Sequence, residues 1–258
     1  MTKYTTDISL KSLLEAGCHF GHTTARYNPK VKPFVYTIKN RVVIFDLAQT
    51  RQKLLEAMEF LYKTASEGKE IIFVGTKRQA AEVIKEEAVK AGAFYVNKRW
   101  WGGTLTNWEQ IKQRIEYLKE TEKKLELGEL DHYTKLEKVR LDRKLQRLKR
   151  FLEGLVGFSG HPGAIVVVDI KKEATAVREA RRLGVPVVAI IDSNADPDWV
   201  DYPIPANDDA IASVKFIVEK LAEAVRAGYQ EQEKKSNKKT MKGNKKVKKS
   251  DKVSKKEV

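Results

Sequence analysis

The sequence has 258 residues, with 50 Lys or Arg against 35 Asp or Glu, so its net charge at pH 7 is +15. This length allows a sizeable core, and the basic balance favours a polyanionic partner, either a nucleic acid or an anionic membrane surface. The single cysteine, Cys18, excludes a disulfide framework and favours the reducing cytoplasm. No apolar run approaches the ~20 residues of a membrane span, and a signal-peptide core is absent, so a soluble chain is expected.

The N-terminal part is predicted to contain one short helix followed by a basic loop. Ser9 is a suitable N-cap for a helix with leucines on one face, and Gly17 is a suitable end. The next segment, HFGHTTARYNPKVKPFVYTIKNR, is basic and aromatic. We expect it to be mostly loop, with a short strand over residues 34–38.

From residue 42 the pattern changes to apolar strands that alternate with amphipathic helices. The strands are predicted at residues 42–47, 71–75, 94–96, 164–170, 185–191 and 202–205, and the last helix at 208–228. Uniformly apolar strands in such an alternation are typical of a parallel sheet covered on both faces. We therefore predict an α/β fold with a Rossmann-like, doubly wound, mostly parallel sheet of about five strands.

Two helical patterns in residues 107–153 interrupt this alternation. Their apolar positions follow the three-and-four spacing of a coiled-coil seam. These positions are Trp108, Ile111, Ile115, Leu118 and Leu125, then Leu141, Leu145, Leu148 and Leu152. Two helices of about 20 residues would form an antiparallel hairpin projecting ~30 Å. We expect this hairpin to be inserted into an α/β domain made of residues 1–106 and 154–229.

Positive charge is concentrated in two parts of the chain. Residues 231–258 contain twelve lysines, four acids and no aromatic side chain, so residues 230–258 are predicted to be a disordered tail. The second hairpin helix has eight cations against three acids over residues 134–153. That imbalance favours a helix lying along phosphate, although a solvated coiled-coil exterior also explains it.

The turn after the strand at 71–75 is where a doubly wound domain would bind a nucleotide phosphate. Its sequence, FVGTKRQA, matches neither G-x-G-x-x-G nor G-x-x-x-x-G-K-[ST]. A nucleotide-dependent enzyme is therefore the alternative hypothesis and not the preferred one. Thr76, Lys77 and Arg78 begin a helix and suit either one phosphate group or an ordinary polar helix cap.

Histidines and acids suggest one possible cation site. His19 and His22 are three residues apart, and several acids follow the last strands of the expected sheet. A site that combines a histidine such as His19 with Asp192 or Asp208 is one hypothesis. Such acids are more often turn and N-cap residues, and no cofactor is expected.

The run NKRWWGGTLTN, residues 97–107, connects the strand at 94–96 to the hairpin. Its tryptophans are interpreted as an apolar plug at this joint, and its glycines allow backbone directions that other residues resist. The structural residues of the joint are expected to be Trp100, Trp101, Gly102 and Gly103. Lys98 and Arg99 would then project outward and contact phosphate or a base.

Four blocks of the sequence closely resemble the second protein of the bacterial small ribosomal subunit. They are LLEAGCHFGHTTARYNPKVKPFVY, FVGTKRQA, NKRWWGGTLTNW and VVAIIDSNADPDWVDYPIPANDDAI, in order between about residues 4 and 228. The resemblance implies a Rossmann-like domain with a coiled-coil arm, no catalytic activity, and binding to small-subunit ribosomal RNA (rRNA). It also implies neighbouring ribosomal proteins as partners, including protein one, which this family helps to seat. Trp101 departs from the family, which often has another apolar residue there; this favours a core position for it.

Structural RNA binding on cytoplasmic ribosomes is therefore the predicted function, and lysines and arginines would neutralise rRNA phosphates. A protein-interaction adaptor whose arm pairs with another helix is a further alternative. No membrane or small-molecule substrate is expected. The residues predicted to contact RNA are Arg26, Lys30, Lys32, Lys77, Arg78, Lys98, Arg99, Arg140, Arg143, Lys144, Arg147 and Arg150.

Overall fold

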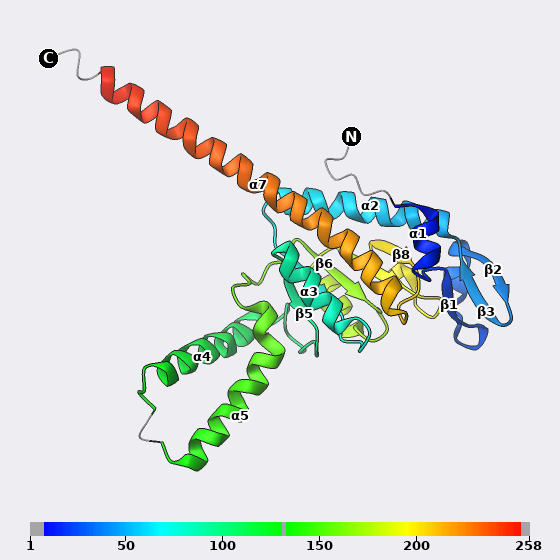
Figure 1. The fold of residues 1–258 in the computed structure, drawn as a ribbon, viewed down its shortest axis with the longest axis horizontal. Coiled ribbons are helices and arrows are strands. Elements are labelled where there is room, and N and C mark those ends of the chain that lie inside the picture. The colour runs from blue at the N-terminus through cyan, green and yellow to red at the C-terminus, as the bar shows by residue number, and fades with distance from the viewer. Residues whose placement is uncertain (1–7, 131–132, 254–258) are drawn as a thin grey trace.

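The structure is a computed structural model that describes residues 8–130 and 133–253, with side chains described as far as Lys235. It contains a five-stranded parallel sheet, a small antiparallel sheet, a projecting pair of helices and a long C-terminal helix (Figure 1). Within these described ranges, no helix is both long enough and apolar enough to cross a membrane.

The parallel sheet confirms the predicted α/β, doubly wound fold class. Its strands are β4 (Ile71–Val74), β5 (Phe94–Val96), β6 (Ala164–Val168), β7 (Val187–Ile191) and β8 (Tyr202–Pro205), in the order β5-β4-β6-β7-β8. Every residue of β4, β6 and β7 is buried, because helices cover both faces. One face packs on α2 (Leu47–Ser66), α3 (Ala81–Ala91) and α7 (Ile211–Val253). The other packs on α6 (Ala174–Arg182) and the base of the helical pair.

The strand predicted at residues 42–47 does not belong to the parallel sheet, so this part of the prediction is wrong. It forms β3 (Val42–Phe45), the centre of an antiparallel sheet with β1 (Phe20–Thr23) and β2 (Val35–Lys39). Asn40 and Arg41 have φ angles of 49° and 63° and form a two-residue turn that pairs β2 with β3. Alternate residues of β3 are buried, as in a sheet with one covered face.

The inserted helices are α4 (Trp108–Glu126) and α5 (Lys135–Leu152), and α5 begins with a capping box between Thr134 and Glu137. The predicted seam closes near the body, where Ile111, Ile115 and Leu118 face Leu145, Leu148 and Leu152 and all six are buried. Leu125, also expected in the seam, is 40% exposed. The two helices accordingly diverge away from the body (Figure 1).

Cys18 lies just beyond helix α1 (Leu10–Glu15), which begins at Ser9 as predicted. The thiol is fully buried, and the hydroxyl of Ser213 on α7 donates to its Sγ atom at 3.4 Å. Burial raises the pKa of Cys18, so the thiol stays protonated at neutral pH.

Helix α7 does not end at Gly228, where the sequence predicted its end. A Cβ atom at Gly228 would lie 2.6 Å from the Cβ of Ala65 and 2.6 Å from the carbonyl oxygen of Tyr62, so glycine here allows α7 to approach α2 closely. Beyond it, the Tyr229 hydroxyl donates to the carbonyl of Lys69 at 3.2 Å, and Tyr62 bonds to Glu231. These contacts hold the helix past its expected end.

Helix α7 continues past residue 230, where the predicted tail begins. Residues 230–235 belong to a helix whose side chains are described, and α7 is assigned as far as Val253. Side chains from residue 236 onward lie outside the described residues. Disorder of the lysine-rich tail stays a prediction.

Replacing Gly228 by Val should destabilise the protein by about 1–3 kcal/mol, because the new side chain would force α7 away from α2. Urea unfolding of the full chain measures this loss. Gly102→Ala is the matched control, since a Cβ there meets nothing within 4 Å. Equal stability of the two variants would contradict the close packing of α7 on α2.

Candidate nucleic-acid interface

The turn after β4 is occupied by the protein's own carboxylates. The carboxylate of Glu173 accepts hydrogen bonds from the backbone N–H of Thr76 at 3.0 Å and from its hydroxyl. Lys77 Nζ lies 2.8 Å from Asp169, 2.8 Å from Asp208 and 2.9 Å from Asp209. An ammonium group has three N–H donors, and these three contacts use them all.

The predicted phosphate contact at Lys77 thus competes with three carboxylates. Burial alone would lower the pKa of Lys77, but hydrogen bonds to Asp169, Asp208 and Asp209 outweigh burial and raise it. The neighbouring Arg78 is exposed and stays available. Carboxylates that occupy the donors of this turn repel an anionic phosphate, which makes the turn unfavourable for a nucleotide cofactor.

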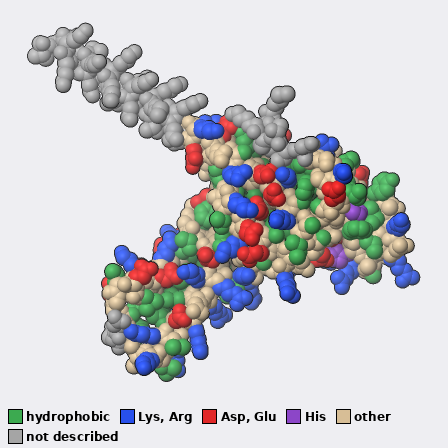
Figure 2. All heavy atoms as spheres, in the orientation of Figure 1, with side chains coloured by type: hydrophobic (Ala, Val, Ile, Leu, Met, Phe, Trp, Pro, Cys, Tyr) green, Lys and Arg blue, Asp and Glu red, His purple; other side chains and the backbone are tan. Residues whose placement is uncertain are grey.

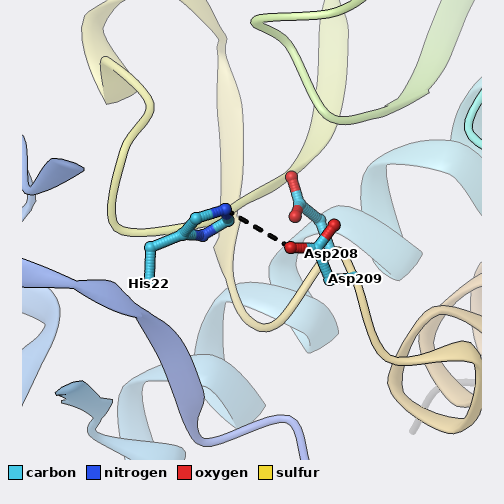
Figure 3. A group of neighbouring side chains, drawn as sticks. All are labelled: His22, Asp208 and Asp209. Carbon is cyan, nitrogen blue, oxygen red and sulfur yellow. Dashed lines mark ion pairs between the residues drawn. The ribbon is translucent and has the colours of Figure 1, made fainter.

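His22 extends this cluster along the carboxyl edge of the sheet (Figure 3). Its Nδ1 atom lies 3.0 Å from Asp192 and its Nε2 atom 3.3 Å from Asp209. The hydrogen bond to Asp192 raises the pKa of His22, although burial opposes it. Burial, reinforced by the charges of Asp192 and Asp169, raises the pKa of Asp208 to about 7.

The residues that could offer ligands to a metal differ from those predicted. His22, Asp208 and Asp209 each bring one ligand atom within 4.8 Å of the others, whereas His19 is not in this group. The Nδ1 atom of His19 is buried and has no partner among the described residues. One imidazole and two carboxylates suit a divalent cation, but the Lys77 ammonium group already contacts both carboxylates. A bound metal therefore stays a hypothesis.

One buried carboxylate holds the joint between body and hairpin. Glu179 on α6 is 8% exposed, and its two oxygen atoms accept five hydrogen bonds. The donors are Trp100 Nε1 at 3.2 Å, the backbone N–H groups of Gly103 at 2.8 Å, Leu105 at 3.0 Å and Thr106 at 3.2 Å, and the Thr106 hydroxyl at 3.3 Å. The whole connection into α4 is thus pinned to α6.

Glu179 was not among the residues predicted from the sequence. A signal was present: Glu179 lies three residues after Ala176, on the buried side of the helix that also carries Ala176 and Ala180. An acid on the core-facing side of a helix needs hydrogen-bond donors around it. The spacing of the apolar residues in α6 indicates that Glu179 needs donors, but it does not indicate which distant segment supplies them.

The joint exposes its cations and covers its aromatic side chains. Lys98 and Arg99 are exposed, Trp100 is buried, and Trp101 is half-buried. The ring of Trp101 lies 5.6 Å from that of Phe151 and 5.3 Å from the guanidinium carbon of Arg114. Trp100, rather than Trp101, is therefore the deeper of the two.

The glycines of the joint are not equivalent. Gly103 has a φ angle of +91°, a conformation that other residues rarely adopt, and its N–H group donates to Glu179. A Cβ at Gly102 would meet no atom within 4 Å. Only Gly103 requires the conformational freedom expected of the pair.

The predicted contacts in the N-terminal loop lie across the end of β7. Arg26 and Lys32 are exposed, whereas Lys30 Nζ lies 2.8 Å from Asp196 and 2.7 Å from Asp198. The strand ends of β4, β5 and β7 place Arg78, the Lys98–Arg99 pair and this loop along one edge of the sheet. The cations predicted in the body therefore share this edge.

Some cations of the basic helix α5 contact other side chains, whereas others are open, meaning exposed and without an ion pair. Lys144 donates to the Tyr117 hydroxyl at 3.0 Å, and Arg150 lies 5.9 Å from the Phe151 ring centroid. Arg140, Arg143 and Arg147 are exposed and form no ion pair within the described part of the chain. Figure 2 shows lysine and arginine side chains over the hairpin and the adjoining part of the body, with acidic side chains between them.

A basic α/β body whose cofactor turn is filled by its own acids has the features of a binding scaffold. Comparison with known proteins agrees: the family described as Ribosomal protein S2 matches residues 13–228. The chain is 50% identical over 221 residues to the small ribosomal subunit protein uS2c of Cyanophora paradoxa, covering 86% of this chain and 95% of that protein. It is 51% identical to uS2c of Guillardia theta, covering 86% and 94%, and 49% identical to uS2 of Acaryochloris marina, covering 86% and 74%.

The chain therefore belongs to the ribosomal protein S2 family. This membership confirms the family that the four sequence blocks indicated. The relatives are named as ribosomal proteins and not as enzymes, so the alternative of a nucleotide-dependent enzyme is not supported.

Replacing Glu179 by Gln should cost about 3 kcal/mol of stability, because an amide NH₂ group would face N–H donors that now bond to a carboxylate oxygen. Urea unfolding measures the loss. Glu116→Gln, an exposed change on α4, should stay within about 0.5 kcal/mol of the wild type. Similar stability of both variants would rule out Glu179 as the anchor of the joint.

The stability contributed by Asp208 should fall as the pH rises from about 4 to 7. Its pKa is about 7 in the folded chain against an ordinary value of 3.8, so over this range the folded state keeps a proton that the unfolded chain releases. Asp208→Asn removes this titration. The free energy of unfolding of the wild type, minus that of the variant, should therefore decrease with rising pH.

Urea titrations at several pH values between 4 and 7 give this difference. Asp142→Asn, an exposed change on α5, is the control and should show no such trend. A difference that grows with pH would mean that Asp208 is stabilised as a carboxylate, with its pairing to Lys77 outweighing its burial.

Proposed function

We propose that this protein is a structural constituent of the small ribosomal subunit that binds rRNA through the basic edge of its sheet and through α5. The observation that carries the proposal is family membership over residues 13–228, together with cations held on a rigid joint. Lysine and arginine side chains would neutralise phosphates and release counterions, so affinity would fall steeply with salt. Folded RNA would be read mainly by shape and by phosphate and 2′-hydroxyl contacts.

Lys98 and Arg99 are the strongest candidates for phosphate contact. Both are exposed, and the next residue, Trp100, is buried and donates to Glu179. Little conformational entropy would be lost when a backbone fixed in this way meets RNA. Arg78 and the open cations of α5 would extend the same contact.

Neighbouring ribosomal proteins are proposed as further partners, including protein one of the small subunit. The exposed apolar side chains of the hairpin tip, Leu127, Leu136 and Val139, offer one surface for protein contact. The adaptor hypothesis is thus part of the same proposal. The location proposed is on the ribosome, and the cytoplasm is the compartment favoured by the lone cysteine.

Changing Lys98 and Arg99 together to Ala should weaken binding to small-subunit rRNA and reduce the slope of log affinity against log salt by about 2, since two phosphate contacts are lost. Filter binding at several salt concentrations measures both effects. Sucrose-gradient sedimentation of lysate then asks whether the variant still travels with the small subunit.

The matched control changes Lys53 and Lys63 on α2 to Ala, since both already pair with carboxylates. That variant should keep the wild-type slope within error. An unaltered slope for the Lys98 and Arg99 variant would remove these residues from the proposed interface. A wild-type chain that fails to bind rRNA at low salt would refute the proposed function.

A further inference from the structure

A pocket of about 420 Å³ lies beside the basic edge of the sheet and is not used by any contact proposed above. It is bordered by the chain that follows β6, by the first turns of α6 and by the loop after β7. Its walls include the apolar side chains of Ile170, Ala174, Val177 and Trp199. This volume and a mostly apolar wall suit a small planar group.

Trp199 presents an aromatic surface at this pocket. It is 43% exposed, which is unusual for so large an apolar side chain. The guanidinium of Arg181 lies 4.9 Å from the centroid of the indole, and Arg181 Nη1 also donates to the carbonyl of Asp198 at 3.0 Å. The indole is therefore supported by Arg181 while much of its surface stays open.

The charges at the rim favour an anionic ligand. Lys171 and Arg178 border the pocket, and neither is paired with a carboxylate among the residues that the structure describes. Arg178 uses Nε to bond to the carbonyl of Ala174 at 3.1 Å, which leaves its terminal nitrogen atoms at the rim. The acid at the rim, Asp196, is neutralised by Lys30 at 2.8 Å.

We propose that this pocket binds a single unpaired base of RNA. The base would stack on Trp199, and its adjoining phosphates would meet Lys171 and Arg178. This inference rests on the proposed function and adds a base-binding site to an interface otherwise made of phosphate contacts. An aromatic side chain of a partner protein fits the apolar wall but not the two cations at the rim.

The test distinguishes binding of an RNA base from binding of the RNA phosphates. Fluorescence anisotropy would compare full-length protein binding to two labelled single-stranded RNA oligomers of ~10 nucleotides, one of normal adenine-containing sequence and one abasic throughout. The wild type should bind the normal oligomer about tenfold more tightly than the abasic one, as expected for one stacked base. Trp199→Ala should bind both oligomers equally, with an unchanged salt slope, because no charge is removed.

Two variants control for other effects. Trp199→Phe keeps an aromatic face and should retain most of the preference for bases. Tyr36→Ala removes another exposed aromatic side chain, 76% exposed on β2 and outside the pocket, and should behave as the wild type. Urea unfolding should show that all three variants fold.

The outcomes are distinct. A base preference that survives in Trp199→Ala, or that is lost equally in Tyr36→Ala, overturns the assignment of the pocket. Equal wild-type binding of both oligomers overturns it too, while leaving the proposed phosphate contacts intact. Absence of wild-type binding to either oligomer or to rRNA at low salt refutes the proposed function itself.

Discussion

The carboxylate of Glu179 is the interaction on which the arrangement of body and hairpin depends. A charged group in the interior is tolerated when donors surround it, and here all five donors come from the segment that leads into α4. Because four of the five belong to the backbone or to an indole, the segment has little freedom to rearrange. The backbone of the exposed Lys98 and Arg99 is therefore held in place. The direction in which the hairpin leaves the body is fixed by the same hydrogen bonds.

A similar use of internal acids distinguishes this sheet from those of nucleotide-binding enzymes. Doubly wound sheets usually bind ligands at the carboxyl ends of their strands. In this chain Glu173 bonds to the turn after β4, and Asp169, Asp208 and Asp209 surround Lys77. The topology is therefore shared with enzymes, whereas the place where chemistry would occur is filled. The cations that stay exposed lie around this cluster, with Arg78 of the turn among them.

Local patterns predicted most of the fold, and the failures share one physical cause. The five parallel strands and the helical pair have periodicities that depend on nearby residues alone. The strand at 42–47 was assigned to the wrong sheet because a two-residue turn pairs it with the strand before it. The predicted end of α7 was too early because Gly228 allows close contact with α2 and does not end the helix. Glu179, His22 and the partners of Lys77 depend on segments far apart in the chain, which no local spacing reveals.

The burial of Cys18 gives the molecule a practical property. It is the chain's one cysteine, and a protonated thiol enclosed by α7 reacts slowly with alkylating reagents. The buried Cys18 consequently leaves the folded protein without a readily reactive native thiol. A cysteine introduced on the outer side of α5 would therefore be labelled selectively with a spectroscopic probe. The native thiol becomes reactive only when the surrounding core opens, so its rate of modification reports directly on that opening.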